Sequence, residues 1–311
     1  MFSTHQRLNV KHATLNLSDY NLPKSDFANW LVGITDGDGS FCFSVNKKKN
    51  CIWNCTFKIA QSRYNLRLLY FIKENLGYGS INKNSGKNMA EFRITDRKTL
   101  LNLIVPLFQK YPLYSTKYFY FLRWKKALEV LENTLYTSIE KNEILTGLKK
   151  QTPLDTYISP AWQSNIPSND WIYGFIEAEA SFFITNKGIS TTAISREKSN
   201  LPCKLVSCEI VKKDRVVHSF GITQKLDKII LEFLQKKFHI SSKVLYTKRN
   251  IYKLETTNSR SIFRIKDFFL NKLKGIKSLE YKIWARSLNY KSHNEKLLKV
   301  QNQLRKLRNK L

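Results

Sequence analysis

An internal repeat constrains this chain more than any other feature of its sequence. Residues 30–41 read WLVGITDGDGSF, and residues 171–182 read WIYGFIEAEASF, 141 positions later. Further on, residues 57–61 (FKIAQ) match residues 220–224 (FGITQ). A third match pairs Lys117 and Trp124 with Lys277 and Trp284. Three matches in the same order predict a duplicated structural unit.

The stretch between the two copies favours a connection. Three of the seven prolines fall within residues 153–167, and proline discourages helix because it fixes φ. The second copy is longer, and its polar residues 187–213 are interpreted as a surface loop or a longer hairpin. We therefore predict five parts: an N-terminal arm over 1–25, a first unit over 26–140, a linker over 141–168, a second unit over 169–291 and a basic helical tail over 292–311.

Local patterns predict the same order of elements in both units. Polar and apolar residues alternate along residues 40–45, which indicates a half-buried strand. Residues 65–76 place their apolar side chains on one face of a helix. Each unit is expected to run helix, two strands, helix, two strands and helix, or αββαββα. The predicted fold class is α+β.

Small residues recur four apart in the first helix of each unit. They are Gly33 and Gly37 in one copy, and Gly174 and Ala178 in the other. Glycine inside a helix costs about 1 kcal/mol relative to alanine, so two of them need a reason. Small residues at this spacing let two helix backbones approach closely. We infer that these two helices pack together about a pseudo-twofold axis.

An acid stands at the C-terminal end of each of these helices, Asp38 in one and Glu179 in the other. The C-terminus of a helix carries partial negative charge, so an acid is unfavourable there. If the helices are paired and parallel, the two carboxylates meet, and hard divalent cations between them would make the arrangement tolerable. Asp36 and Glu177 lie two residues earlier, on another helical face, and are expected to bridge structurally.

The net charge of +29 narrows the range of partners. A surplus of this size is typical of proteins that bind nucleic acid or anionic membranes. The charge is spread along the chain, and no apolar stretch reaches the ~20 residues of a membrane span, so nucleic acid is favoured and no membrane is expected. Five cysteines, an odd number in a long chain, do not indicate a disulfide framework.

The paired motifs carry a resemblance to a known family. Residues 31–39 and 172–180 resemble the two signature helices of LAGLIDADG homing endonucleases in their single-chain, two-repeat form. The resemblance implies two antiparallel sheets that form a saddle over DNA. It also implies that Mg²⁺, with Mn²⁺ as a substitute, is held by the last acid of each motif and the carbonyl before it. The metal site would then consist of Asp38, Glu179, Gly37 and Ala178, and the other catalytic residues would be Gln61, Gln224, Lys117 and Lys277.

Two positions depart from the family pattern. Ala180 stands where the motif usually ends in glycine, and modest backbone strain is expected there. The turn Gly77-Tyr-Gly79 has no glycine counterpart in the second unit, which reads FHISS over residues 238–242. Neither departure touches the acids.

Strand alternation then selects the side chains that would face DNA. Arg and Asn read guanine and adenine edges, and Lys also contacts phosphates. In the first unit the expected DNA-binding residues are Ser40, Cys42, Ser44, Asn54, Thr56, Lys58, Asn82, Asn84 and Arg93. In the second unit they are Ser181, Phe183, Thr185, Arg215, Ser219, Lys248 and Lys253.

The sequence thus predicts a monomeric, site-specific DNA endonuclease that makes a Mg²⁺-dependent double-strand break. The target would be an intronless allele with a long pseudo-palindromic site, and cutting would promote intron homing. Lys outnumbers Arg, and Asn, Ile and Tyr are abundant, as in AT-rich organellar genomes, so the mitochondrion is expected, with the chloroplast as the alternative. Two other functions stay open: an RNA maturase that binds its host intron RNA, and a metal-free DNA-binding regulator.

Overall fold

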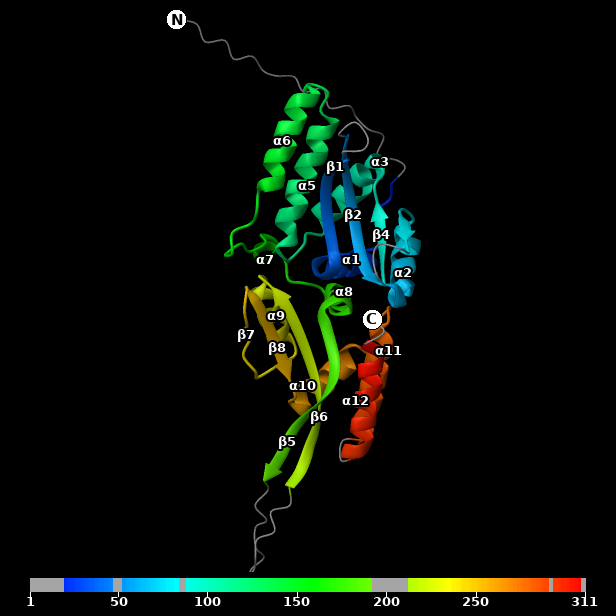
Figure 1. Cartoon of the computed structure of the whole chain (residues 1–311), viewed down its shortest axis with the longest axis vertical. Coiled ribbons are helices and arrows are strands. Elements are labelled where there is room, and N and C mark those ends of the chain that lie inside the picture. Colours follow the sequence, from blue (N-terminus) through cyan, green and yellow to red (C-terminus); the bar gives the residue numbers. More distant parts are fainter. Residues whose placement is uncertain (1–19, 47–51, 84–87, 192–211, 291–292, 309–311) are drawn as a thin grey trace, which may run out of the picture.

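Each half of the chain folds into a four-stranded antiparallel sheet with helices on one face. The computed structural model describes residues 20–46, 52–83, 88–191, 212–290 and 293–308. The two sheets lie towards opposite ends of the long axis, and helices α1 and α8 meet between them (Figure 1). The predicted α+β class with two antiparallel sheets is confirmed. No helix among the described residues is both long and apolar enough to cross a membrane.

The first unit contains four strands and its own set of helices. In chain order its main elements are α1 (Ser25–Asp38), β1 (Gly39–Asn46), β2 (Ile52–Ser62), α2 (Leu66–Leu76), β3 (Ser80–Asn82), β4 (Met89–Ile94), α4 (Val105–Lys110), α5 (Lys117–Glu132) and α6 (Ser138–Lys150). Short turns complete it: η2 (Arg63–Asn65), α3 (Arg97–Thr99) and the π-helical η3 (Leu100–Ile104).

The second unit repeats this order after a connection that contains α7 (Ala161–Ser164). Its elements are α8 (Asn169–Glu179), β5 (Ala180–Thr191), β6 (Lys212–Lys225), α9 (Lys228–Lys237), β7 (Leu245–Tyr246), β8 (Ile251–Thr256), α10 (Ser259–Phe268), α11 (Lys277–Ser287), η4 (Leu288–Tyr290) and α12 (Asn294–Arg308).

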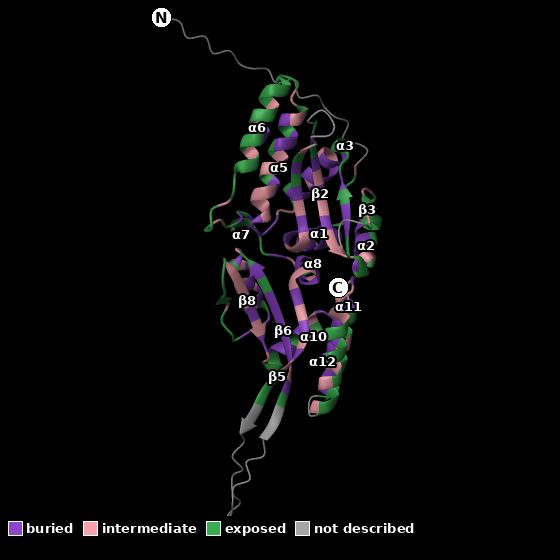
Figure 2. Cartoon of the chain, viewed as in Figure 1, coloured by how far each residue is buried: buried purple, intermediate pink, exposed green. Residues whose placement is uncertain are grey.

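The two sheets have equivalent strand orders, β1-β2-β4-β3 and β5-β6-β8-β7. The registers are equivalent too, because Phe41 pairs with Phe57 as Phe182 pairs with Phe220. These phenylalanines point into the helix-covered side, where Trp124 or Trp284 packs against them. Along the strands, buried residues alternate with half-exposed and exposed ones (Figure 2). Each sheet therefore keeps one polar face free of helices.

The first unit ends later than predicted. The expected boundary at residues 140 and 141 falls inside α6, which starts at a capping box between Thr137 and Glu140. Leu145 of this helix is fully buried, and Asn142 accepts a hydrogen bond from Trp53 Nε1 at 3.2 Å. The prolines that indicated a linker start only at residue 153, so residues 141–150 belong to the first unit.

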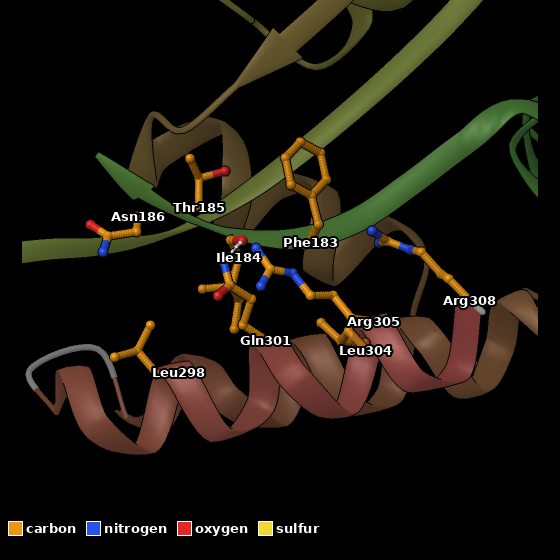
Figure 3. Close-up of a pocket in the computed structure, with 9 residues that line it drawn as sticks. All are labelled: Phe183, Ile184, Thr185, Asn186, Leu298, Gln301, Leu304, Arg305 and Arg308. Atoms are coloured by element: carbon orange, nitrogen blue, oxygen red, sulfur yellow. Dashed lines mark hydrogen bonds between the residues drawn. The ribbon is translucent and has the colours of Figure 1, made fainter. Parts of the chain in front are cut away.

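The predicted tail is likewise part of the second unit. Helix α12 buries Leu297 and Leu304, and Gln301 Nε2 donates to the carbonyl of Ile184 on β5 at 2.8 Å. Figure 3 shows α12 running below β5, with Arg305 and Arg308 reaching up towards the strand. A groove of about 510 Å³ lies between them. The helix satisfies backbone groups of an edge strand that could otherwise pair with another chain.

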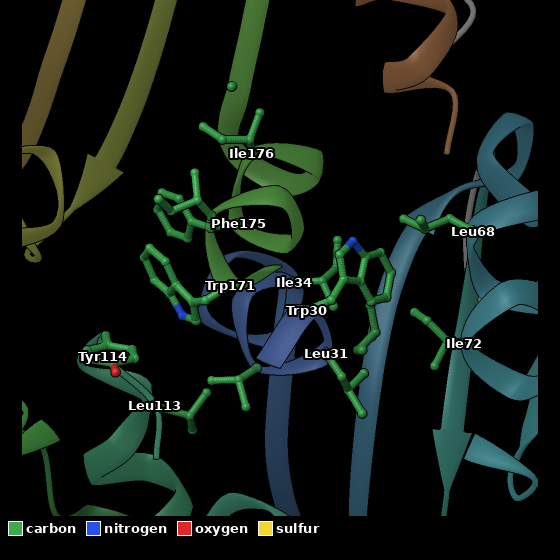
Figure 4. Close-up of a cluster of buried hydrophobic side chains, with 14 of the residues drawn as sticks. Trp30, Leu31, Ile34, Leu68, Ile72, Leu113, Tyr114, Trp171, Phe175 and Ile176 are labelled. Carbon is green, nitrogen blue, oxygen red and sulfur yellow. The ribbon is translucent and has the colours of Figure 1, made fainter. Parts of the chain in front are cut away.

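Helices α1 and α8 cross in direct backbone contact, as their small residues predicted. A Cβ atom at Gly33 would lie 2.0 Å from the carbonyl oxygen of Trp171, and one at Gly174 would lie 2.0 Å from that of Trp30. At Gly37 it would lie 2.2 Å from Cβ of Ala178, so only one of these two positions can carry a methyl group. Figure 4 shows large apolar side chains of both helices around the crossing.

The two departures from the family pattern are accommodated without disturbing the helix pair. Ala180 has φ −89° and ψ 160°, an extended conformation that any residue adopts, so the expected strain is absent at this residue. In the first unit Gly77 adopts a left-handed conformation with φ 77° after α2. His239 adopts φ 50° in the corresponding turn, and its carbonyl accepts a hydrogen bond from Ser261 Oγ at 2.9 Å.

Candidate active site and nucleic-acid interface

The ends of α1 and α8 bring Asp38 and Glu179 together. A Cβ atom on Gly37 would lie 3.3 Å from Cγ of Glu179, which shows how closely the second acid approaches the first helix end. The helices run in parallel towards this point, because Gly33 lies against Trp171 and Gly37, one turn later, lies against Ala178. The sequence predicted that the two acids meet if the helices pair in parallel, and the small residues four apart indicated that pairing.

Burial and mutual repulsion disfavour the charged forms of this pair. Burial raises the pKa of Glu179 to about 7, and the neighbouring charge of Asp38 adds to the rise. Burial also raises the pKa of Asp38, although Lys117, Gln61 and Lys277 act in the opposite direction. The two carboxylates therefore form a centre that another cation would stabilise.

In the first unit the predicted catalytic side chains converge on Asp38. Gln61 Nε2 donates to Asp38 Oδ2 at 2.5 Å, and Lys117 Nζ donates to the carbonyl of Gly37. Burial lowers the pKa of Lys117, while the charges of Asp38 and other nearby acids oppose that shift. The strand end, the helix end and the start of α5 thus place an amide, a carboxylate and an ammonium side by side.

In the second unit the equivalent side chains are arranged differently. Lys277 Nζ donates to the carbonyl of Ala180 at 2.6 Å and to Glu280 Oε2 at 3.2 Å. Gln224 is buried, and within the described chain no hydrogen bond joins it to Glu179. The two halves of the site are therefore unequal, although the sequence assigns them the same residue types.

Asp36 and Glu177 hold the loops that precede the two lysines, as their position on the helix predicted. Asp36 accepts from the backbone N–H groups of Tyr114 and Ser115 at 3.0 and 2.9 Å. Glu177 accepts from the N–H of Gly275 at 3.0 Å. Burial raises the pKa of both acids, and these hydrogen bonds counter the rise. Their role is to position the lysine loops.

Two further residues join the units and were not found from the sequence. Asn65 Oδ1 accepts from the N–H of Ile276 at 2.8 Å, and Asn65 Nδ2 donates to Gln61 Oε1 at 2.8 Å. Conversely, Asp227 of the second unit accepts from the N–H and hydroxyl of Thr116 in the first unit. Both follow a predicted catalytic glutamine by three or four residues, which is the only signal that the sequence offers.

The donor set at the helix ends fits Mg²⁺ when phosphate is present. Mg²⁺ is usually held by one or two carboxylates together with water and substrate phosphates. Asp38 and Glu179 supply two carboxylates, whose pKa values are raised. Gly37 and Ala178, the residues before them, are half-buried, and the carbonyl of Gly37 accepts a hydrogen bond from Lys117. Within the described residues no cluster of three or more His, Cys, Asp or Glu side chains could hold a metal alone.

The polar face of the first sheet collects the side chains expected to meet DNA. Ser40 pairs with Lys58 and Cys42 with Thr56, while Lys58 also faces Arg93 on β4. Glu91 forms ion pairs with both of these basic side chains, at 3.5 Å from Lys58 and 3.7 Å from Arg93. Ser44, Asn54 and Asn82 share this face, and Asn84 lies outside the described residues.

The second sheet presents a similar face with one exception. Ser181, Phe183, Thr185, Arg215 and Lys253 lie on it, and Lys248 is exposed in the turn before β8. Ser219 is on the same face but is only 1% exposed, and its hydroxyl shares a hydrogen bond with Thr185 at 2.8 Å. The prediction that Ser219 contacts a base is therefore wrong, because its neighbours cover it.

Comparison with known proteins agrees with this geometry. The family model described as LAGLIDADG endonuclease matches residues 31–128. A "Probable intron-encoded endonuclease Cox1-I1b" from Schizosaccharomyces pombe is 35% identical over 318 residues, which cover 99% of this chain and 75% of that protein. This chain belongs to the LAGLIDADG endonuclease family.

Other proteins match over part of the chain or in their fold. An "Uncharacterized mitochondrial protein RF1" of Saccharomyces cerevisiae is 34% identical, over 52% of this chain and 33% of that protein. The structure of meganuclease I-SmaMI bound to uncleaveable DNA superposes with a TM-score of 0.71 at 24% identity, covering 94% of this chain and 98% of that one. I-CpaMI bound to uncleaved DNA gives 0.70 at 24%, covering 88% and 98%. These two structures show that the LAGLIDADG fold spans both units.

Proposed function

We propose that this endonuclease is a monomeric homing enzyme that makes a Mg²⁺-dependent double-strand break at a specific DNA site. The observation that carries the proposal is the meeting of Asp38 and Glu179 at the joined ends of α1 and α8. Two polar sheet faces flank that point, so a duplex lying across both would place its two backbones near the acids. Two of the structural relatives are meganucleases bound to DNA, which supports this partner.

The chain's own groups suit hydrolysis of a phosphodiester. Bound Mg²⁺ would activate water and stabilise charge on the leaving oxygen. Asp38 and Glu179 would hold it together with phosphate oxygens, and Gln61 keeps the Asp38 carboxylate in one orientation. The ammonium groups of Lys117 and Lys277, which lie at the carbonyls of Gly37 and Ala180, would add positive charge where the phosphate gains negative charge.

Intron homing and a mitochondrial location rest on the relatives. Several similar proteins are named as probable intron-encoded endonucleases, and one carries a cox1 intron in its name. We infer that this chain is encoded in an intron of a mitochondrial gene and cuts the intronless allele. Host intron RNA as a second partner stays a prediction from sequence.

Selection from a DNA library tests the proposal and identifies the target sequence in the same experiment. The purified chain is incubated with randomised duplexes and Mg²⁺, and cleaved molecules are sequenced. We expect one long site with two similar but unequal halves, cut on both strands, and no cutting after chelation with EDTA. Cutting that persists without divalent metal, or a failure to cut any duplex while the folded protein binds DNA tightly, would overturn the proposal.

A further inference from the structure

The two active-site lysines are equivalent in sequence but not in space. Lys117 and Lys277 each begin a helix, α5 or α11. Lys117 Nζ reaches the carbonyl of Gly37, immediately before Asp38. Lys277 Nζ reaches the carbonyl of Ala180, immediately after Glu179, at 2.6 Å. The two ammonium groups therefore lie on opposite sides of their own acid along the chain.

Glu280 accounts for this difference. It lies one helical turn after Lys277, and its Oε2 is 3.2 Å from Lys277 Nζ. The pseudo-equivalent residue of the first unit is Tyr120, 160 positions earlier, whose ring packs against Phe119 and Arg123. Tyr120 has no carboxylate, so Lys117 is not held in this way.

The Glu280 carboxylate is fixed by contacts from three elements. Its Oε1 accepts from the backbone N–H of Phe182 on β5 at 2.7 Å and from Arg308 of α12 at 2.8 Å. The side chain is only 1% exposed. Burial alone would raise the pKa of Glu280, but the charges of Lys277 and Arg308 and these hydrogen bonds outweigh burial and lower it. The carboxylate is therefore charged and cannot turn away from Lys277 without losing two other bonds.

We propose that Glu280 is a positioning residue that restrains Lys277 and makes the endonuclease cut its two DNA strands at different rates. This inference rests on the proposed function. The strand that depends on Lys117 is cut first, and the strand that depends on Lys277 is cut second.

The physical reason is electrostatic. An ammonium group stabilises a phosphoryl transition state through its charge and its reach. A carboxylate 3.2 Å away offsets much of that charge and holds the group towards the protein. Lys117 also lies near acids, Asp38 first among them, but its hydrogen bond goes to a backbone carbonyl and no carboxylate of the described residues forms an ion pair with it. Asp38 would also share its charge with a bound metal. The phosphate near Lys277 therefore receives less stabilisation than the phosphate near Lys117.

Glu280→Gln tests this restraint with little change of shape. The amide oxygen can still accept from Phe182 N–H and Arg308, which turns the amide NH₂ towards Lys277, and two donors cannot bond to each other. Single-turnover cleavage of a duplex carrying the selected site is followed with each strand labelled separately. We expect the wild-type nicking rates to differ by about tenfold, and the variant to bring the slow strand within about threefold of the fast one.

The first unit offers the reciprocal variant. Tyr120→Glu places a carboxylate one turn after Lys117, and it should slow the strand that wild type cuts first. Lys277→Met identifies the strand that depends on Lys277, which must be the strand accelerated in Glu280→Gln. The ratio of the two rates does not depend on the fraction of folded enzyme, so loss of stability alone leaves it unchanged.

Three outcomes overturn the inference while the endonuclease itself still cuts. They are equal nicking rates in wild type, a slower second strand in Glu280→Gln, and an unchanged ratio in both variants. A slower second strand would mean that Glu280 holds Lys277 in its working position. Failure of wild type to cut any selected duplex would instead count against the proposed function.

Discussion

Asp227 of the second unit accepts hydrogen bonds from the backbone N–H and the hydroxyl of Thr116 in the first unit, at 2.7 and 2.6 Å. Its counterpart, Asn65, accepts from the N–H of Ile276 at 2.8 Å. Each contact fixes the residue immediately before a lysine that is predicted to be catalytic. The two units thus hold each other's lysine loops, one with a carboxylate and the other with an amide.

Asp227→Asn should keep both hydrogen bonds and remove a buried charge. Burial is the main reason that the pKa of Asp227 is raised to about 6 from an ordinary 3.8. The folded protein therefore binds more protons than the unfolded chain between these values, and its stability falls as the pH rises through them. We expect wild type to lose about 1–3 kcal/mol relative to the variant between about pH 4 and about pH 6.5, measured by urea unfolding. A difference that does not change with pH would contradict this.

Asn65→Asp is the mirror substitution and should have the opposite effect. It removes the amide that donates to Gln61 at 2.8 Å and adds a charge in a buried position. We expect a loss of about 1–3 kcal/mol at neutral pH, together with slower cutting, because Gln61 no longer has a fixed orientation towards Asp38. The same unfolding experiment measures the loss, and a variant as stable as wild type would show that this contact contributes little.

Gly33→Ala should destabilise the protein through the helix crossing. The new methyl group would lie 2.0 Å from the carbonyl oxygen of Trp171, so α1 and α8 must separate. We expect a loss of at least about 2 kcal/mol. Gly147→Ala is the matched control, because apart from its chain neighbours and the nearby backbone of α6 no atom lies within 4 Å of its added Cβ, and alanine favours helix by up to about 1 kcal/mol. Thermal melting of both variants decides the point, and equal melting temperatures would exclude the close crossing.

Binding to DNA should depend steeply on salt. With a net charge of +29 and lysines on both polar faces, we expect at least about six phosphate contacts. Each contact contributes about −0.9 to the slope of log K against log salt, so the slope should be steeper than about −5. Fluorescence anisotropy with a labelled target at several salt concentrations measures it. A slope shallower than about −3 would mean that few basic residues contact the backbone.

The repeat made the helix pair and its two acids predictable from the sequence. Glycine is unfavourable inside a helix, so Gly33 and Gly174 indicated the close backbone contact that the structure has. The alternation along residues 40–45 correctly predicted which side chains lie on the polar face of the sheet. The last helix of each unit was assigned to a linker or a tail instead. The capping box of Thr137 and Glu140, which marks the start of α6, was overlooked, because the prolines from residue 153 onward gave the stronger signal.

The polar contacts that join the units outside the helix pair could not be predicted. Asn65 and Ile276 are 211 residues apart, and no local pattern relates them. Glu280 was missed for another reason: its counterpart is Tyr120, so comparing the two copies gave no match. Ser219 was placed on the correct face, but alternation does not reveal that neighbouring side chains cover it.

The central claim is that Asp38 and Glu179 hold the metal and have no other essential role. Removing either charge relieves their mutual repulsion, so Asp38→Asn and Glu179→Gln should fold and bind the selected duplex as wild type does. The decisive measurement is the single-turnover rate of double-strand cleavage in Mg²⁺ for the two variants, with affinity and melting temperature measured on the same samples. We predict normal binding, melting no lower than wild type, and cutting at least ~100-fold slower. Cleavage at the wild-type rate by both variants would contradict the account and make Asp36 and Glu177 the acids to test.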